Sequence, residues 1–229
     1  MTRRNKLLKF TENLTFPNVY ESFEYGSAQL TGKLGSKTTL TGKWGEAHFK
    51  NSNPITLELA CGRGEYCLGL AKRYPDRNYI GVDIKGARIW KGAKTALEND
   101  IPNVAFLRTK IESLDLFFAE GEISEIWITF PDPFLKDAKY NRRLTSPNFL
   151  KIYKKLLKPD GVINLKTDSE PFYNHTREVI QENDHEVVID SPDIYAGSQP
   201  HPDLDILTFY ERMHLKDNRT IRYLQYRLA

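Results

Sequence analysis

From residue 55 onward the chain alternates short apolar runs with longer segments of helical character, and this alternation restricts the possible folds more than any other feature. Short apolar runs bounded by turn residues are typical of strands that are buried on both faces. Strands connected through helices form right-handed crossovers, which place the strands parallel to one another in one sheet. The predicted strands are 55–60, 79–84, 104–107, 125–130 and 162–165, and the predicted helices are 65–73, 87–99, 113–119, 147–157 and 170–183.

The C-terminal part of the chain is expected to complete this sheet. Residues 206–214 and 220–228 have the pattern of two strands with a turn at 216–218 between them. We therefore expect an α/β fold of the Rossmann-like, doubly wound type. Its seven-stranded sheet would be mostly parallel, with antiparallel pairing at the C-terminus, and would form one domain over residues 55–229.

Residues 1–54 differ from the rest of the chain. They are rich in Thr, Gly, Ser and Lys, and they show no sustained helical period. We expect an irregular, basic N-terminal arm in this region. The side chains predicted to pack this arm against the domain are Phe16, Tyr20, Phe23, Tyr25 and Trp44.

Several classes of protein are disfavoured by what the chain lacks. It contains no run of about 18 apolar residues, so we expect no membrane-spanning helix. The basic start is not followed by an apolar core and a cleavage site, which argues against a secretory signal. Cys61 and Cys67 form neither a CxxC pair nor a metal-binding quartet, so we expect a reduced, cytoplasmic protein without a metal. The sequence leaves a monomer and a homodimer equally open.

Positive charge is unevenly distributed along the chain. The formal net charge is only +3, yet residues 136–158 carry eight Lys or Arg and one acidic residue. The first 54 residues carry eight basic and four acidic residues. Such clusters can follow a phosphate backbone, although a solvated helix face gives the same pattern. Charge alone does not decide between a nucleic-acid contact and an ordinary surface.

A nucleoside site is predicted at the end of the first strand of the domain. Gly62 and Gly64 allow a sharp turn and the close approach of a ligand to the backbone. Asp83 ends the second strand, where a carboxylate can accept hydrogen bonds from both ribose hydroxyls. Glu58 interrupts an apolar strand, and burying it unpaired would be costly. It is therefore expected to orient the glycine loop or to meet the cationic methionine part of S-adenosylmethionine.

A tight turn that caps a helix would explain the glycines alone, so the combination with the two carboxylates carries the prediction. A dinucleotide remains an alternative ligand. Cys67 occupies the place of the third glycine of a dinucleotide-binding loop, which counts against NAD. S-adenosylmethionine has no pyrophosphate and needs no such cradle.

Residues 130–134 (Phe-Pro-Asp-Pro-Phe), here called the proline segment, follow the fourth predicted strand. Two prolines fix the backbone and prevent a helix from starting there. Asp132 is thereby presented at the strand end, beside the predicted cofactor, and Phe134 is available for stacking on a base. The alternative is a proline-rich turn in which Asp132 makes a local hydrogen bond.

More polar residues follow the proline segment and the fifth predicted strand. Basic residues interleaved with an aromatic side chain suit phosphate contacts and stacking on an unpaired base. Asp168 lies at the same predicted sheet edge, although it could instead cap the next helix. Thr208 and Glu211 offer a hydroxyl and an acid, or merely an exposed strand face. The basic side chains concerned are Lys136, Lys139, Arg142 and Arg143.

Taken together, these motifs resemble those of the bacterial tRNA (guanine-N7-)-methyltransferases, from about Trp44 to the C-terminus. Their joint occurrence in this order is far more specific than any one of them. The matching segments are ELACGRG at 58–64, FPDPFLK at 130–136, NRRL at 141–144, TD at 167–168 and TFYE at 208–211.

The resemblance implies an enzyme that transfers a methyl group from S-adenosylmethionine to N7 of a guanine in the variable loop of tRNA. Together, the residue patterns and the resemblance predict a site made by residues of four kinds. The residues predicted to bind the cofactor are Glu58, Gly62, Gly64, Asp83 and Asp132, and Asp132 is also the predicted catalytic residue. The residues predicted to bind the substrate are Lys136, Asp168, Thr208 and Glu211, and those predicted to contact RNA are Lys139, Arg142 and Arg143.

Four residues depart from the family pattern. Ala60 replaces a glycine, which is tolerable if its φ is negative. Phe134 and Ser169 stand where the family usually has tryptophan, and Lys110 stands where an acid often lies near the adenine. The residues themselves also leave open a small-molecule methyltransferase, a nucleotide-dependent dehydrogenase and a non-catalytic RNA-binding module.

Overall fold

The centre of the molecule is a set of five parallel strands. The computed structural model describes residues 3–22 and 24–229. All five predicted strands are confirmed within a few residues, and the last is longer than expected. They are β4 (Ile55–Leu59), β5 (Asn78–Asp83), β6 (Val104–Arg108), β7 (Ile123–Thr129) and β8 (Leu157–Thr167), in the sheet order β6-β5-β4-β7-β8.

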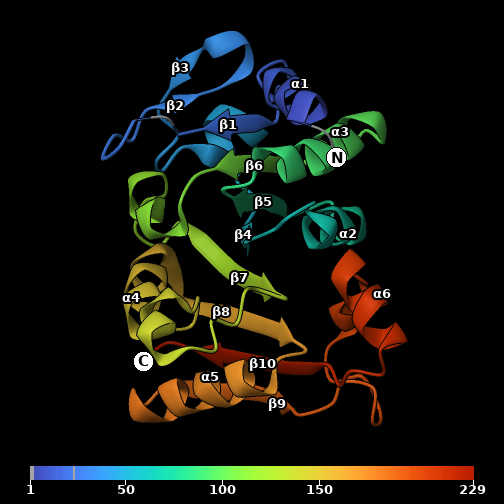
Figure 1. Ribbon diagram of the computed structural model, residues 1–229. Coiled ribbons are helices and arrows are strands. Elements are labelled where there is room, and N and C mark those ends of the chain that lie inside the picture. The colour runs from blue at the N-terminus through green and yellow to red at the C-terminus, as the bar shows by residue number, and fades with distance from the viewer. Residues whose placement is uncertain (1–2, 23) are drawn as a thin grey trace.

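Helices cover both faces of this sheet, as expected for a doubly wound fold (Figure 1). On one face lie α2 (Glu65–Arg73) and α3 (Gly86–Glu98), above a buried cluster that includes Tyr66 and Trp127. On the other face lie α4 (Pro147–Leu156) and α5 (Glu170–Glu182). A 3₁₀ helix, η3 (Ile111–Leu116), stands where a fifth helix was predicted.

The C-terminal region closes the sheet antiparallel, but not as predicted throughout. Strand β10 (Arg222–Arg227) confirms the second predicted strand and pairs with β8 on one side and β9 (Glu186–Ser191) on the other. Strand β9 was not predicted, because this edge strand is mostly exposed and its apolar run, 187–189, is only three residues long. With β9 and β10 the domain has the expected seven strands.

The prediction of a strand at 206–214 is wrong. This segment follows η5 (Pro202–Asp205) and contains most of α6 (Phe209–Lys216). The hydroxyl of Thr208 accepts a hydrogen bond from the Glu211 N–H at 3.1 Å, so Thr208 is the N-cap of α6. A Thr-x-x-Glu pattern is a known helix start, and this signal outweighs the apolar residues between the two positions.

The N-terminal arm is more regular than expected. It contains α1 (Arg3–Asn13), two helical turns, η1 (Lys33–Gly35) and η2 (Trp44–Phe49), and the strands β1 (Val19–Glu21), β2 (Leu30–Thr31) and β3 (Lys37–Thr38). Strand β1 pairs in parallel with β6, which extends the sheet over the described residues to ten strands. A domain boundary at residue 54 remains a prediction.

Two of the five predicted packing residues of the arm are buried, and a third is partly buried against the core. Phe16 and Trp44 are buried, and the ring of Tyr20 lies edge-on against that of Trp44 at 5.3 Å between centroids. Tyr25 is 97% exposed, so its predicted packing role is wrong. Phe23 lies outside the described residues. No helix in the described parts of the chain combines the length and the apolar character needed to cross a membrane.

Candidate active site

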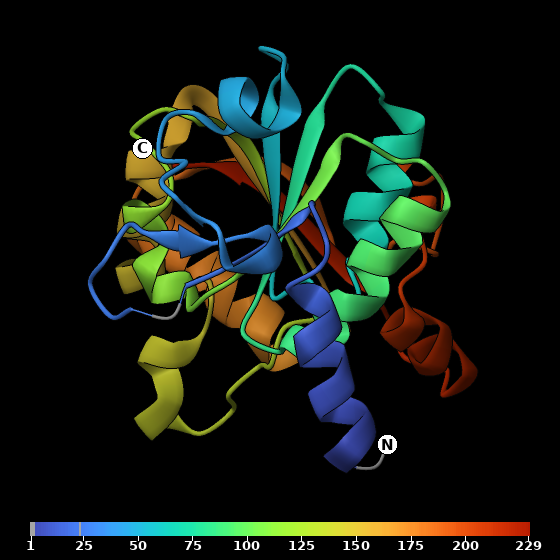
Figure 2. The same cartoon turned by 90° about the horizontal axis from the view of Figure 1, so that it is seen from above.

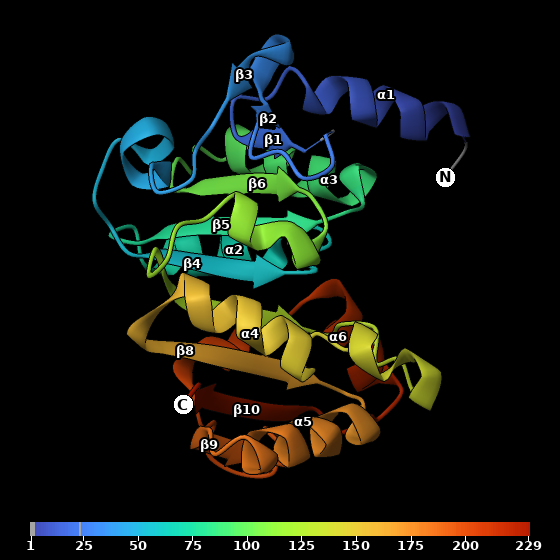
Figure 3. The same cartoon turned by 90° about the vertical axis from the view of Figure 1, so that its left-hand side faces the viewer.

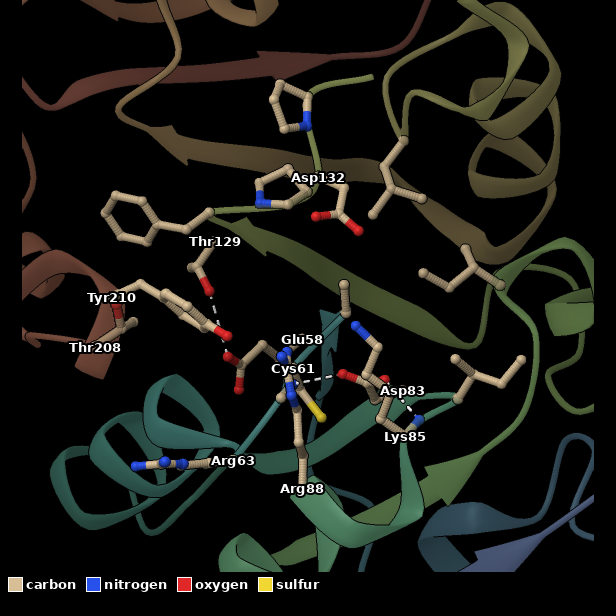
Figure 4. A pocket seen from close by; sticks show the side chains of 18 of the residues that line it. Glu58, Cys61, Arg63, Asp83, Lys85, Arg88, Thr129, Asp132, Thr208 and Tyr210 are labelled. Carbon is tan, nitrogen blue, oxygen red and sulfur yellow. Dashed lines mark hydrogen bonds between the residues drawn. The ribbon is translucent and has the colours of Figure 1, made fainter. Parts of the chain in front are cut away.

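A large cavity opens where the carboxyl ends of the parallel strands meet (Figure 4). Its volume is about 1440 Å³, which exceeds the roughly 300–1,000 Å³ of a typical small-molecule site. It therefore has room for more than one ligand of moderate size. Residues that follow five strands line it, namely Cys61, Asp83, Thr109, Asp132 and Asp168, together with residues of α1, α3 and α6.

The two loop glycines both have left-handed backbones but face different surroundings. Gly62 has φ +57° and lines the cavity, and a Cβ added to it would meet no atom within 4 Å. Gly64 has φ +64°, and a Cβ there would lie 2.4 Å from Cε1 of Phe106. Gly64 does not line the cavity. The structure thus supports a ligand-facing role for Gly62 and argues that Gly64 serves helix–sheet packing instead.

Asp83 is buried at the end of β5 and is fixed by two backbone hydrogen bonds. Its Oδ2 accepts from the Gly62 N–H at 2.9 Å, and its Oδ1 accepts from the Lys85 N–H at 2.8 Å. Each oxygen keeps a second lone pair. The carboxylate therefore joins the glycine loop to β5 and can still receive the two hydroxyls of a ribose from the cavity (Figure 4).

Glu58 is a buried carboxyl group that lines the same cavity. Its Oε2 accepts from the Cys67 N–H in the first turn of α2 at 2.9 Å, and its Oε1 accepts from the Thr129 hydroxyl at 3.4 Å. Burial raises the pKa of Glu58 to about 7. No cationic side chain of the described residues pairs with it, so a cationic ligand group would compensate its charge.

The backbone beside the glycine loop contradicts one expectation. Ala60 has φ +54°, not the negative φ under which alanine would be tolerated without strain. An L-residue in this conformation costs roughly 1–2 kcal/mol. The site retains this strain between β4 and the cavity.

The proline segment is strained at both ends. Phe130 has φ +48° and Phe134 has φ +42°, a conformation that is unusual for bulky residues. The Phe130 N–H donates to the Lys166 carbonyl at 2.8 Å, which ties the start of the segment to β8. Asp132 is exposed to the cavity and makes no hydrogen bond or ion pair with the described residues. Strain of this kind is concentrated at functional sites.

Asp168 lies on the cavity wall and does not cap α5. The N-cap is Ser169, whose hydroxyl accepts from the Phe172 N–H at 3.4 Å. Asp168 Oδ2 instead accepts from Arg219 at 2.8 Å, and its Oδ1 lies 3.7 Å from His214 Nε2. The capping alternative is therefore wrong, and the carboxylate is already partly neutralised by Arg219.

Thr208 and Glu211 do not share a role. Thr208 lines the cavity, whereas the Glu211 side chain is fully buried behind it. Glu211 Oε2 accepts from Lys166 Nζ at 2.7 Å, and its Oε1 accepts from the Tyr195 hydroxyl at 2.8 Å. The Glu211 side chain is thus engaged by Lys166 and Tyr195, and its predicted contact with a substrate stays a prediction. The residue holds the start of α6 against β8.

The chain matches one family over most of its length. A family model described as "Putative methyltransferase" matches residues 52–224. The tRNA (guanine-N(7)-)-methyltransferase of Christiangramia forsetii is 46% identical over 100% of both chains. The enzyme of the same name from Bacteroides fragilis is 45% identical, over 98% of this chain and 86% of its own length. The chain belongs to the tRNA (guanine-N7-)-methyltransferase family.

Solved structures agree with this assignment at the level of the fold. The 16S rRNA methyltransferase KamB superposes with a TM-score of 0.62 at 15% identity, over 82% of this chain and 93% of its own. An S-adenosylmethionine-dependent methyltransferase from Aquifex aeolicus gives a TM-score of 0.54 at 12% identity, over 77% and 82%. This methyltransferase therefore has the Rossmann-like fold that the sequence predicted.

The paired arginines of the methyltransferase differ in their surroundings. Arg142 is exposed, and its guanidinium lies 4.8 Å from the centroid of the Phe134 ring. Arg143 is 8% exposed, and its Nε donates to the Phe134 carbonyl at 3.2 Å. Arg143 therefore braces the proline segment, and its predicted contact with RNA stays a prediction. Lys136 and Lys139 are exposed beside the cavity, at the helical turn η4 (Asp137–Arg142).

Two groups of site residues were missed by the sequence analysis. Lys166 is a charged residue within an apolar strand, the same signal that identified Glu58, and its burial lowers its pKa. The second group consists of aromatic rings of α6 that line the cavity with cations over them. Arg63 lies 4.4 Å from the Phe209 ring and Arg88 lies 5.7 Å from the Tyr210 ring. No sequence spacing connects these partners.

Proposed function

We propose that this protein transfers the methyl group of S-adenosylmethionine to N7 of a guanine in tRNA, in the variable loop by family resemblance. The observation that carries the proposal is the grouping of three carboxyl groups around one cavity. Glu58 and Asp83 are buried and fixed, and Asp132 is exposed and has no partner among the residues that the structure describes. The relatives described above bear the name of this activity.

The residues present fit S-adenosylmethionine. Asp83 offers two oxygens to a ribose, Gly62 leaves open space beside the backbone, and Glu58 offers an uncompensated buried carboxyl group to a cation. When bound, the cofactor supplies an electrophilic methyl group. Lys110 lines the cavity and does not provide the acid that often receives the adenine amino group.

The chemistry of guanine N7 does not require a general base from the protein. This nitrogen carries an in-plane lone pair, so its methylation requires no prior deprotonation. The protein must chiefly hold the two reactants in line, and well-aligned groups can lower a barrier by about 7–11 kcal/mol. The stiff proline segment suits this role, because it fixes the position of Asp132.

Asp132 is the residue that we assign to the reacting base. As an exposed carboxylate without a protein partner, it can accept hydrogen bonds from guanine N1–H and N2–H₂, which adenine does not offer in that arrangement. It can also stabilise the positive charge that develops on the purine. Asp168 is less suited to this task because Arg219 already engages it.

The RNA would be held beside the cavity by the exposed cations Lys136, Lys139 and Arg142, and the Phe134 ring is available for stacking. We further propose a cytoplasmic location and a monomeric or homodimeric state, and sedimentation analysis distinguishes the two states.

The activity is tested by incubating an unmodified tRNA transcript with labelled S-adenosylmethionine. Borohydride and aniline then cleave the RNA at N7-methylguanosine. The proposal predicts labelled tRNA that is cleaved at one guanine. Labelling without cleavage would indicate another methylated atom, and labelling of small molecules but not of tRNA would favour a small-molecule methyltransferase.

A further inference from the structure

A group of cations lines the cavity on the side opposite the proline segment. Lys9 of α1, Lys85 at the start of α3, and Arg88 and Lys91 of α3 all border the cavity, and we call these four residues the α1–α3 strip. Lys85 and Lys91 are exposed, and Lys9 and Arg88 are half-buried. None of the four forms an ion pair with a described side chain. The strip therefore presents uncompensated positive charge to the cavity mouth.

The strip is built on a firm support. Asn13 Nδ2 donates to the Gly86 carbonyl at 3.0 Å, and Trp90 Nε1 donates to Glu12 Oε2 at 2.7 Å. The Phe10 ring lies so close to Gly86 that a Cβ there would be 2.5 Å from it. These contacts dock α1 onto α3, so its position relative to the cavity is fixed.

The nearby acidic side chains do not neutralise the strip. Glu12 is engaged by Trp90 and by Lys94, whose Nζ lies 3.4 Å away, and Glu98 lies 4.0 Å from the same lysine. Asp83 receives two backbone N–H groups on the floor of the cavity. The local balance of charge thus favours a polyanion at this edge.

The two basic edges of the cavity lie on opposite sides of its mouth. In Figures 2 and 3, α1 and the helical turn 137–142 both project past the carboxyl ends of the strands, from different sides of the sheet. An internal nucleotide of an RNA chain is joined to its two neighbours by one phosphate on each side. When its base enters a cavity, these two phosphates lie on opposite flanks of the cavity mouth. Cations on one side of the mouth can hold only one of these two flanks.

We propose that the α1–α3 strip binds backbone phosphates of the RNA on the flank opposite Lys139 and Arg142. The nucleotide between the two flanks would then extend down to the floor of the cavity. This inference rests on the proposed function, because it assumes that RNA is the substrate. Arg88 beside the Tyr210 ring also favours RNA, since arginine and aromatic groups stack on unpaired bases.

The test compares two triple variants of the full chain. In the first, Lys9→Gln, Lys85→Gln and Lys91→Gln remove three charges of the strip. In the matched control, Lys43→Gln, Lys50→Gln and Lys72→Gln remove three exposed charges near the amino-terminal ends of the strands. The affinity for tRNA is measured between 50 and 200 mM salt, and the affinity for S-adenosylhomocysteine is measured separately.

The strip variant should bind tRNA about 10- to 100-fold more weakly at low salt. Its slope of log affinity against log salt should fall by about 2 to 3, since each phosphate contact contributes about 0.7–0.9. The control should keep the wild-type slope, and both variants should keep their affinity for S-adenosylhomocysteine. Equal slopes for strip variant and control would overturn the proposal, as would a strip variant that loses S-adenosylhomocysteine instead of tRNA.

Failure of the inference can be distinguished from failure of the proposed function. If the wild type methylates guanine N7 while the strip variant binds tRNA normally, only the strip is refuted. If the wild type binds tRNA with a slope that the strip variant lowers, but methylates another atom, the strip stands and the proposed reaction is refuted. If the wild type binds no tRNA, both are refuted.

Discussion

The two loop glycines offer the most specific test of how the site is built. Gly62 and Gly64 are separated by one residue and have nearly the same left-handed backbone. Their sequence positions alone predict the same role for both. The structure predicts that alanine at Gly64 damages the fold, whereas alanine at Gly62 damages the cofactor site.

The magnitudes follow from the surroundings of each glycine. An alanine with a left-handed backbone lowers the free energy of unfolding by roughly 1–2 kcal/mol. Replacing glycine by alanine also lowers the conformational entropy of the unfolded chain, which raises the free energy of unfolding by about 0.4–1 kcal/mol. Gly62→Ala has only this net cost, about 1 kcal/mol, because its Cβ meets no atom. Gly64→Ala adds an overlap at 2.4 Å with the fully buried Phe106 ring, and such overpacking costs about 1–3 kcal/mol. Its total cost should be about 3 kcal/mol.

Thermal unfolding and calorimetric titration with S-adenosylhomocysteine separate the two effects. For a chain of this length, 1 kcal/mol corresponds to about 2–4 °C in Tm. We expect Gly64→Ala to lower Tm by about 6–12 °C, and Gly62→Ala by about 2–4 °C. We expect Gly62→Ala to weaken ligand binding at least tenfold, because its methyl group enters the cavity. Equal losses of Tm, or a larger loss of affinity in Gly64→Ala, would refute this reasoning.

Three further predictions concern charged side chains. Burial raises the pKa of Glu58 to about 7, so the native state binds more protons than the unfolded state between pH 4.5 and 7. The free energy of unfolding should therefore fall as the pH rises through this interval. The variant Glu58→Gln should flatten this part of the pH profile of stability. Lys166→Met alone or Glu211→Leu alone should lower the free energy of unfolding by about 3–5 kcal/mol, because each leaves a buried charge without its partner. The double variant should recover much of this loss, since apolar groups can replace a buried ion pair. Additive losses in chemical denaturation would contradict the pairing. Arg142→Gln should weaken tRNA binding and leave the single-turnover rate constant near normal. Arg143→Gln should lower that rate constant and leave the affinity for tRNA unchanged. The reverse pattern would contradict the separate roles of the two arginines.

The strands and the buried carboxyl groups on the cavity floor could be predicted from the sequence because local signals specify them. A charged residue in an apolar strand identified Glu58, and its position at a strand end identified Asp83. Both lie at the carboxyl edge of the sheet, where all parallel strands end together. The positions of these two residues follow from the strands that contain them and do not depend on contacts with distant segments.

The sequence did not reveal the surroundings of residues whose contacts are long-range. The local sequence around Glu211 is compatible with a surface acid, but the side chain is buried against Lys166, which lies 45 positions earlier in the chain. Arg143 has the same sequence context as Arg142, but only the fold directs it to the Phe134 carbonyl. The pairing of β1 with β6 likewise joins distant segments, and no local pattern indicates it.

The central claim is that methyl transfer occurs at guanine N7 in tRNA. It is tested most directly with a tRNA transcript in which 7-deazaguanosine replaces guanosine, because this base has a carbon in place of N7 and keeps the N1–H and N2–H₂ groups. The protein should methylate the ordinary transcript and transfer no label to the substituted one, although both should bind. Equal labelling of the two transcripts would contradict the proposed reaction.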